Sequence, residues 1–205
     1  MAVVSNGTTI IDAGALGSGV ATGAMTLLST VTASSSSVLS FTSGLTSSFD
    51  HYIFKFINIH PGSDGEHLQF QTNVDGATGF NESITAIHFR AVLAEADNDK
   101  YVHYHNDPSS FVQGNGTSFQ PIATYLGNDN DQASNGTLTL FSPASTVSVK
   151  HYTSEFAICN SNNYIQHNFT AGYFNVTAAI DEIQFKMTSG NIDSGIIKLY
   201  GVNAG

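Results

Sequence analysis

The sequence contains few of the residues on which several classes of protein depend. Cys159 is its only cysteine, so no disulfide can form within the chain, and stability has to come from packing and assembly. Lys and Arg together number 6 against 16 Asp and Glu, which gives a formal net charge of -10. Because an acidic surface repels phosphate groups, we expect the protein to bind neither nucleic acid nor an anionic membrane.

Long apolar runs are also missing. Residues 13–49 carry no charged side chain, but Ser, Thr, Gly and Ala dominate them, which makes the segment too polar for a transmembrane helix. The N-terminus has no basic region before an apolar stretch, as a secretory signal peptide would require. We therefore expect neither a membrane span nor a secretion signal.

The abundant residues favour β-structure. Phe occurs 14 times, Tyr 8 times and Gly 19 times, whereas only 11% of the residues are charged. Aromatic and β-branched side chains suit a pleated sheet, and long helices need more Ala, Leu, Glu, Lys and Arg than are present. At 205 residues the chain is long enough for one domain with a substantial core. These features predict an all-β domain.

The clearest pattern lies near the C-terminus. Apolar and polar residues alternate at 183–187 and again at 196–200, which is typical of strands with one buried face. Residues 188–195 between them are rich in Gly, Ser and Asn, which favour turns. We therefore predict a β-hairpin that closes a sheet, with Phe185 and Leu199 facing the core.

The same stretch carries a family resemblance. Residues 189–201 (SGNIDSGIIKLYG) resemble the closing hairpin of β-sandwich proteins found among the structural proteins of tailed bacteriophages, especially phages of marine and cyanobacterial hosts. Four further blocks are similar to the same group: VSNGTTIIDAG at 4–14, YIFKFINIHP at 52–61, LGNDNDQ at 126–132 and FTAGYFNVTAAI at 169–180. The resemblance implies an antiparallel β-sandwich of jelly-roll type and a place in a virion.

Strand patterns continue through the rest of the chain. They lie at 27–31, 38–41, 52–59, 67–71, 122–126, 137–141, 147–158 and 171–176. About ten strands with no βαβ rhythm indicate a sandwich or a barrel, and the resemblance favours the sandwich. Residues 52–59 are apolar at most positions, which predicts a central strand covered on both faces. Residues 84–93 fit either a short helix or a strand with Ile84, Ala86, His88 and Arg90 on one face.

The first 24 residues differ in character from the rest of the chain. Small residues and frequent Gly alternate with brief apolar pairs and show no helical period. We therefore divide the chain into an extended N-terminal arm, 1–24, and a β-sandwich domain, 25–205; a flexible tail is the alternative for the first part. The arm would press its apolar side chains into a neighbouring subunit: Val3, Val4, Ile10, Ile11 and Leu16.

Residues 97–116 read as a long polar loop dotted with aromatic side chains. Long loops in compact domains are usually functional, so we single out Tyr101, His103, Tyr104 and His105 as candidates for contact with a partner protein or a glycan. His103 and His105 with Asp107 could also hold zinc or copper, although loop histidines explain the pattern equally well.

Asn128 to Asp131 offer oxygen ligands for calcium, but a polar turn accounts for them too. The chain has no Gly-x-Ser-x-Gly elbow and no phosphate-binding Gly-rich motif. We therefore expect no catalytic residue, no cofactor and no bound metal.

The resemblance then implies a function. It points to a non-enzymatic virion protein, made in the cytoplasm of the host bacterium, that decorates or cements the capsid or forms a head fibre. The expected partners are other virion proteins, the major capsid protein above all, and further copies of the chain in a homotrimer. The alternative is a tail-fibre or receptor-binding module that recognises glycans on the host surface.

Overall fold

A computed structural model describes residues 2–12, 15–16, 25–104 and 111–203 of the chain, and within these ranges every regular element is a β-strand. The alternating pattern, rich in aromatic and β-branched residues, thus gives the expected all-β fold. The strands are β1 (Val3–Ser5), β2 (Thr8–Asp12), β3 (Ala15–Leu16), β4 (Met25–Ser36), β5 (Leu39–Phe41), β6 (His51–Pro61), β7 (Glu66–Val74), β8 (Ile84–Ala94), β9 (Lys100–Tyr104), β10 (Gln113–Gly116), β11 (Gln120–Leu126), β12 (Ser134–Phe141), β13 (Lys150–Cys159), β14 (Tyr164–Phe174), β15 (Ile180–Met187) and β16 (Ile192–Val202).

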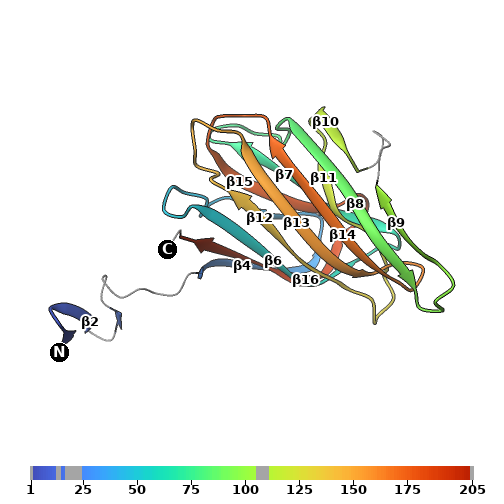
Figure 1. The fold of residues 1–205 in the computed structure, drawn as a ribbon, viewed down its shortest axis with the longest axis horizontal. Coiled ribbons are helices and arrows are strands. Elements are labelled where there is room, and N and C mark those ends of the chain that lie inside the picture. Colours follow the sequence, from blue (N-terminus) through green and yellow to red (C-terminus); the bar gives the residue numbers. More distant parts are fainter. Residues whose placement is uncertain (1, 13–14, 17–24, 105–110, 204–205) are drawn as a thin grey trace.

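The strands form one large and one small antiparallel sheet that pack against each other (Figure 1). The large sheet has the order β10-β8-β14-β13-β12-β6-β16-β4, and β9 pairs with the same edge of β8 as β10. The small sheet has the order β11-β7-β15-β5. Since the small sheet has four strands, it covers only part of the inner side of the large one.

Aromatic rings from both sheets make the core. The ring of Phe185 on β15 lies 5.4 Å from that of Phe54 and 5.1 Å from that of Phe56, both on β6 of the opposite sheet. Phe70 on β7 meets Tyr152 on β13 edge to face at 4.9 Å. Such contacts add specific geometry to the burial of large apolar surfaces, so this cluster fixes how the two sheets sit on each other.

The prediction of a closing hairpin is wrong: both strands, β15 and β16, are present, but they do not pair with each other. β15 pairs with β5 and β7 in the small sheet, and β16 pairs with β4 and β6 in the large one. Phe185 and Leu199 nevertheless both face the core and are fully buried. An alternating pattern says which residues turn inward but not which sheet a strand joins, and residues 188–191 cross from one sheet to the other.

Two further expectations concern β6 and β8. Residues 52–59 are not covered on both faces as predicted: Tyr52, Phe54 and Phe56 are buried, but Lys55 between them is exposed on the outer side of the large sheet. Residues 84–93 are a strand, not a helix, and Ile84, Ala86 and His88 lie buried on the face that was predicted for them.

Residues 97–116 and the N-terminus hold more strand than expected. β9 and β10 both lie in the segment predicted to be a long loop, and both pair with β8. β1, β2 and β3 form a three-stranded sheet of their own, with no strand pairing to the two larger sheets, and Figure 1 shows it apart from them.

Candidate functional site: an uncharged face of the large sheet

The outer side of the large sheet presents aligned rows of side chains from neighbouring strands. Phe89 on β8 pairs with Phe169 on β14, which pairs with Glu155 on β13, while Tyr104 on β9 continues the row beyond Phe89. Directly paired residues point to the same side of a sheet, so every second residue of these strands contributes to one surface. We call the outward residues of β8, β13 and β14, together with Val102 and Tyr104 of β9, the β8–β13 face.

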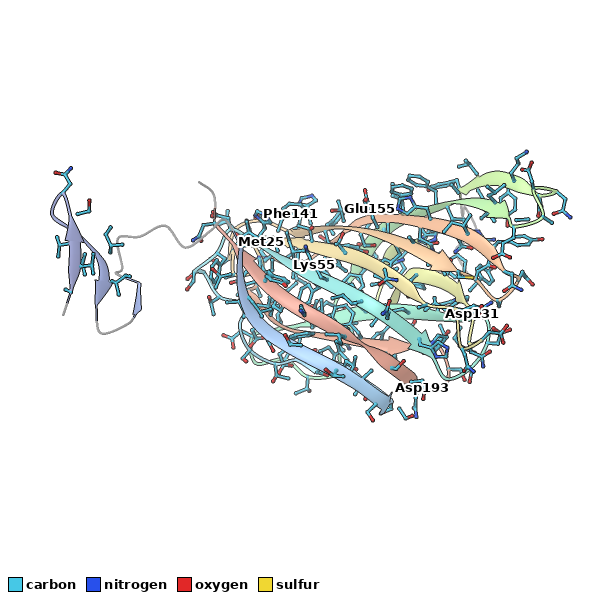
Figure 2. The ribbon with its side chains drawn as sticks, turned by 90° about the horizontal axis from the view of Figure 1, so that it is seen from below. Met25, Lys55, Asp131, Phe141, Glu155 and Asp193 are labelled. Carbon is cyan, nitrogen blue, oxygen red and sulfur yellow. The ribbon has the colours of Figure 1, made fainter. Side chains whose placement is uncertain are left out.

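This surface is almost free of charge. The outward residues of the three long strands are Thr85, Ile87, Phe89, Ala91 and Leu93 of β8, Ile165, His167, Phe169, Ala171 and Tyr173 of β14, and His151, Thr153, Glu155, Ala157 and Cys159 of β13. Glu155 is the only carboxylate among these described positions, and none of them is Lys or Arg. Two lysines, Lys55 on β6 and Lys198 on β16, lie opposite each other in the strand register, but these strands are separated from the face by β12 (Figure 2).

Several of these apolar side chains are open to solvent. The exposed fraction is 48% for Ile87, 51% for Ile165 and 75% for Val102. Phe89 and Phe169 stack on each other with their ring centroids 4.8 Å apart, which leaves one broad aromatic surface instead of two separate rings. Contiguous exposed apolar surface on a protein usually marks a place where another molecule binds.

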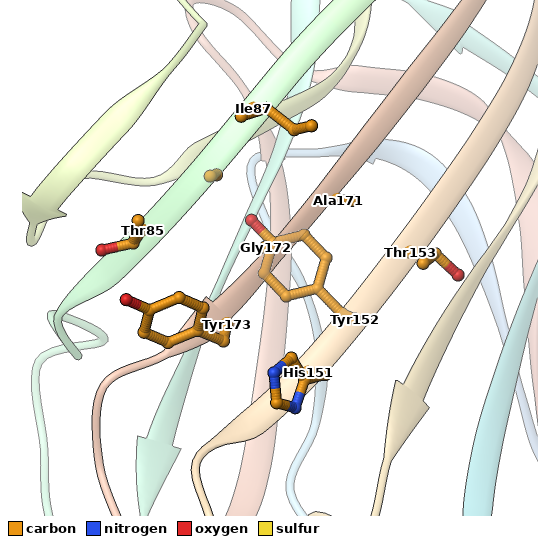
Figure 3. Close-up of a pocket in the computed structure, with 9 residues that line it drawn as sticks. Thr85, Ile87, His151, Tyr152, Thr153, Ala171, Gly172 and Tyr173 are labelled. Atoms are coloured by element: carbon orange, nitrogen blue, oxygen red, sulfur yellow. The ribbon is translucent and has the colours of Figure 1, made fainter.

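Two adjacent hollows shape the face. The first, of about 330 Å³, lies over the outward side chains of Thr85, His151 and Tyr173 and the small residues Ala171 and Gly172 (Figure 3). The second, of about 200 Å³, lies beside it between Phe89, Phe169 and Glu155. Ala171 lines both, because its short side chain stands between the larger neighbours Ile87 and Thr153.

Gly172 lines the first hollow at a position where no side chain fits. A Cβ atom at this position would lie 2.6 Å from the hydroxyl oxygen of Tyr152 and 2.7 Å from the carbonyl oxygen of Thr85, so no larger residue fits without a shift of the strand. Tyr152 extends toward Gly172 from the core side (Figure 3), and burial raises the pKa of its phenol.

The predicted contact residues 101–105 do not act as one group. Val102 and Tyr104 point to the outer side with Phe89, and Tyr104 is 51% exposed. Tyr101 and His103 point to the other side, where the ring of Tyr101 lies 5.8 Å from the guanidinium of Arg90. His105 and Asp107 lie outside the described residues, so the possibility that they hold a metal ion with His103 falls there too.

The apolar residues expected to form an assembly arm lie in the small N-terminal sheet. Val3 and Val4 are more than half exposed on β1, Ile11 on β2 is exposed, and Ile10 is half-buried. Leu16 lies on β3, which pairs with β2. The segment predicted to be an extended arm therefore contains an antiparallel sheet, β1 to β3, which the sequence pattern did not predict.

The acidic stretch at 128–131 forms a turn. The backbone N–H of Asn128 donates to Asp64 at 3.2 Å, and that of Asp129 donates to the side chain of Gln132 at 3.1 Å. Among the described residues, no group of three or more His, Cys, Asp or Glu side chains is placed to hold a metal ion.

The β8–β13 face was not predicted from the sequence, although a signal for it is present there. Residues 84–94 are apolar on both sides of the strand, so one side had to be buried and the other left open or covered by a partner. Within the described ranges no helix has the length and apolar character needed to cross a membrane. In comparisons with known proteins, no family model, no curated protein and no solved structure matches the chain.

Proposed function

We propose that the chain is a non-enzymatic structural protein of a tailed-phage particle, a capsid decoration or head-fibre subunit that associates with copies of itself through the β8–β13 face. The observation that carries the proposal is the contrast between this nearly uncharged, largely apolar face and the acidic chain around it. The blocks that resemble phage β-sandwich proteins support the assignment to a virion. The major capsid protein is the partner on which the assembled subunits would sit.

Charge explains why the partner at this face is a second copy. Each copy carries a formal net charge of -10, so two copies repel each other wherever acidic surfaces meet. The β8–β13 face has one carboxylate, Glu155, so the faces of two copies can approach each other with little electrostatic repulsion. Its exposed Ile87, Phe89 and Ile165 lose water on contact, which provides the driving force. A closed trimer is the assembly we favour; in it each subunit would set one part of this face against a different part of its neighbour's, so that the face is buried on every subunit.

We further propose that the two larger sheets form a jelly roll. The supporting observation is that the first half of the chain pairs with the second half in reverse order: β4 with β16, β5 with β15, β6 with β12, and β7 with β11. Such pairing is what one long antiparallel hairpin gives when it is rolled into two sheets. In this interpretation β8, β13 and β14 are additions that widen the large sheet.

The N-terminal arm, in this proposal, fixes the subunit to the particle. Its sheet carries the exposed side chains of Val3 and Val4 and has no strand pairing with the rest of the described chain. A small separate unit with apolar residues on its surface is suited to dock into a groove of a neighbouring capsid protein. The β8–β13 face and the arm would then have different partners.

Counting copies in purified particles tests the proposal against its alternative. A decoration protein is present in a fixed ratio to the major capsid protein, whereas a tail-fibre or receptor-binding module is present in far fewer copies. We expect quantitative mass spectrometry of the particles to give the fixed ratio. A handful of copies, or none, would contradict the proposed place on the capsid.

A further inference from the structure

A second pocket lies at the edge of the small sheet and is unlike the β8–β13 face in chemistry. Its volume is about 370 Å³, which is within the range of small-molecule sites. Rings and neutral polar groups line it together: His67, Gln69, Phe111, Ser118, Phe119, Pro121, Tyr125 and Thr188. We call this hollow the β11 pocket, because the residues on and just before β11 supply half of its wall.

Three rings stand edge to face on one side of the pocket. The ring of His67 lies 5.0 Å from that of Phe111 and 4.8 Å from that of Tyr125, and all three pairs are close to perpendicular. The backbone N–H of Tyr125 donates to Nδ1 of His67 at 2.9 Å, so the ring hydrogen of a neutral His67 is on Nε2. No described residue takes a hydrogen bond from this Nε2 position, which is free to donate to a ligand.

Tyr125 is held in this place by an unusual backbone. Its φ is +59°, a left-handed conformation that costs free energy for a bulky residue and is often found at binding sites. The guanidinium of Arg90 lies 4.4 Å from the Tyr125 ring and donates to the side chain of Gln166 at 3.0 Å. The ring therefore packs between His67 and Arg90, in a fixed orientation before any ligand arrives.

The rest of the pocket lining combines a ring with hydrogen-bonding groups. Nζ of Lys186 lies 3.9 Å from the centre of the Phe119 ring. This contact holds one face of the half-buried Phe119 side chain. Gln69 donates to the carbonyl of Met187 at 3.4 Å, and its side-chain oxygen has no partner within the described chain. The hydroxyl of Thr188 donates to Glu66 at 2.6 Å and so has a fixed orientation.

We propose that the β11 pocket binds a pyranose unit of a carbohydrate. A sugar ring has an apolar side formed by C–H groups, which packs on aromatic rings, and a rim of hydroxyl groups, which exchange hydrogen bonds with neutral donors and acceptors. The pocket supplies the Phe119 ring for the first, and Nε2 of His67 and the Gln69 oxygen for the second. Because it lies on the other sheet from the β8–β13 face, the site is independent of the proposed assembly.

Saturation-transfer NMR with simple sugars tests the proposal on the full chain. The probes are the methyl pyranosides of glucose, galactose, mannose and rhamnose, together with N-acetylglucosamine. We expect at least one of them to bind saturably with a Kd on the order of 1 mM and to shift the ¹⁵N resonance of His67 Nε2. Absence of saturable binding by the whole panel would overturn the proposal.

Three variants locate the binding. Phe119→Ala and Gln69→Ala should each weaken binding, the first by about tenfold because it removes a stacking surface. Phe141→Ala, which truncates an exposed ring on β12 of the large sheet, is the matched control and should bind as the parent does. Melting curves show that each variant is folded. Equal binding by the parent and both pocket variants would place the sugar elsewhere and overturn the assignment to this pocket.

Discussion

At the scale of single residues, two buried tyrosines differ in how their hydroxyl groups are satisfied. The hydroxyl of Tyr52 accepts from the N–H of Thr46 and donates to the carbonyl of Thr46, both at 2.7 Å. The hydroxyl of Tyr152 has no hydrogen-bond partner among the described residues. Since an unsatisfied buried hydroxyl costs free energy, the two positions should respond differently to loss of the oxygen.

We therefore predict that Tyr152→Phe leaves the melting temperature unchanged or raises it. Tyr52→Phe is the matched control and should lower the free energy of unfolding by about 1–3 kcal/mol, because the backbone groups of Thr46 lose their partner. Thermal and urea unfolding followed by circular dichroism measure both. An equal loss in the two variants would mean that Tyr152 has a partner, such as a buried water.

His67 should make the stability of the folded protein depend on pH. Burial lowers its pKa from the usual 6.5, with Glu66 opposing the shift and Arg90 adding to it. The unfolded chain therefore takes up a proton at higher pH than the folded one, so stability is full above pH 6.5 and decreases as the pH falls through that value. His67→Asn should remove this part of the decrease. Parallel slopes for the parent and His67→Asn between pH 7 and 5 would contradict the prediction.

At the scale of strands, the core depends on the ring of Phe185. This ring contacts those of Phe41, Phe54, Phe56 and Phe70, which come from both sheets. Phe185→Ala would leave a cavity among them, so we expect a loss of about 3–5 kcal/mol in the free energy of unfolding.

Leu199→Ala should cost about 2–5 kcal/mol for the same reason, since the side chain of Leu199 is fully buried on β16. Val147→Ala, at an 86% exposed loop position, is the control for both core variants and should change stability little. Urea unfolding of the three variants compares them. Core variants that unfold together with the control would mean that the last two strands are peripheral.

The strands also show what a sequence pattern can predict. Alternation identified most long strands, the inward sides of β8, β15 and β16, and the burial of Phe185 and Leu199. It could not tell that β15 and β16 lie in different sheets, because pairing partners far apart in the chain leave no local mark. β9 and β10 were missed because they are short and lie in a segment whose many polar residues resemble a loop. Both form at the edge of β8.

The β8–β13 face and the β11 pocket could not be predicted from the sequence for the same reason: both depend on which strands become neighbours. The β8–β13 face arises only when β8 lies beside β13 and β14, which are far from it in the chain. The β11 pocket brings together β7, β11, the residue after β15 and Phe111. Tyr104 could be chosen in advance as an exposed aromatic residue, but its neighbour Phe89 could not.

At the scale of the whole molecule, the N-terminal arm and the β8–β13 face are expected to have separate roles. Deleting residues 1–20 should leave a folded, self-associating protein that no longer occupies phage particles, because the exposed Val3 and Val4 are lost with the N-terminal sheet of β1, β2 and β3. Mass spectrometry of particles after incubation with the truncated and full-length chains measures occupancy. Equal occupancy by both chains would show that the arm does not anchor the subunit.

Sedimentation equilibrium of the parent and the double variant Ile87→Lys, Phe89→Lys tests the central claim most directly. Both residues are solvent-exposed in one subunit, so the variant should melt like the parent, but two lysines on each copy would be buried without partners on association. We predict an oligomer for the parent, strengthened by salt that screens the acidic charge, and a monomer for the variant. Val147→Lys is the control and should assemble normally. A monomeric parent, or a double variant that assembles as the parent does, would contradict the account.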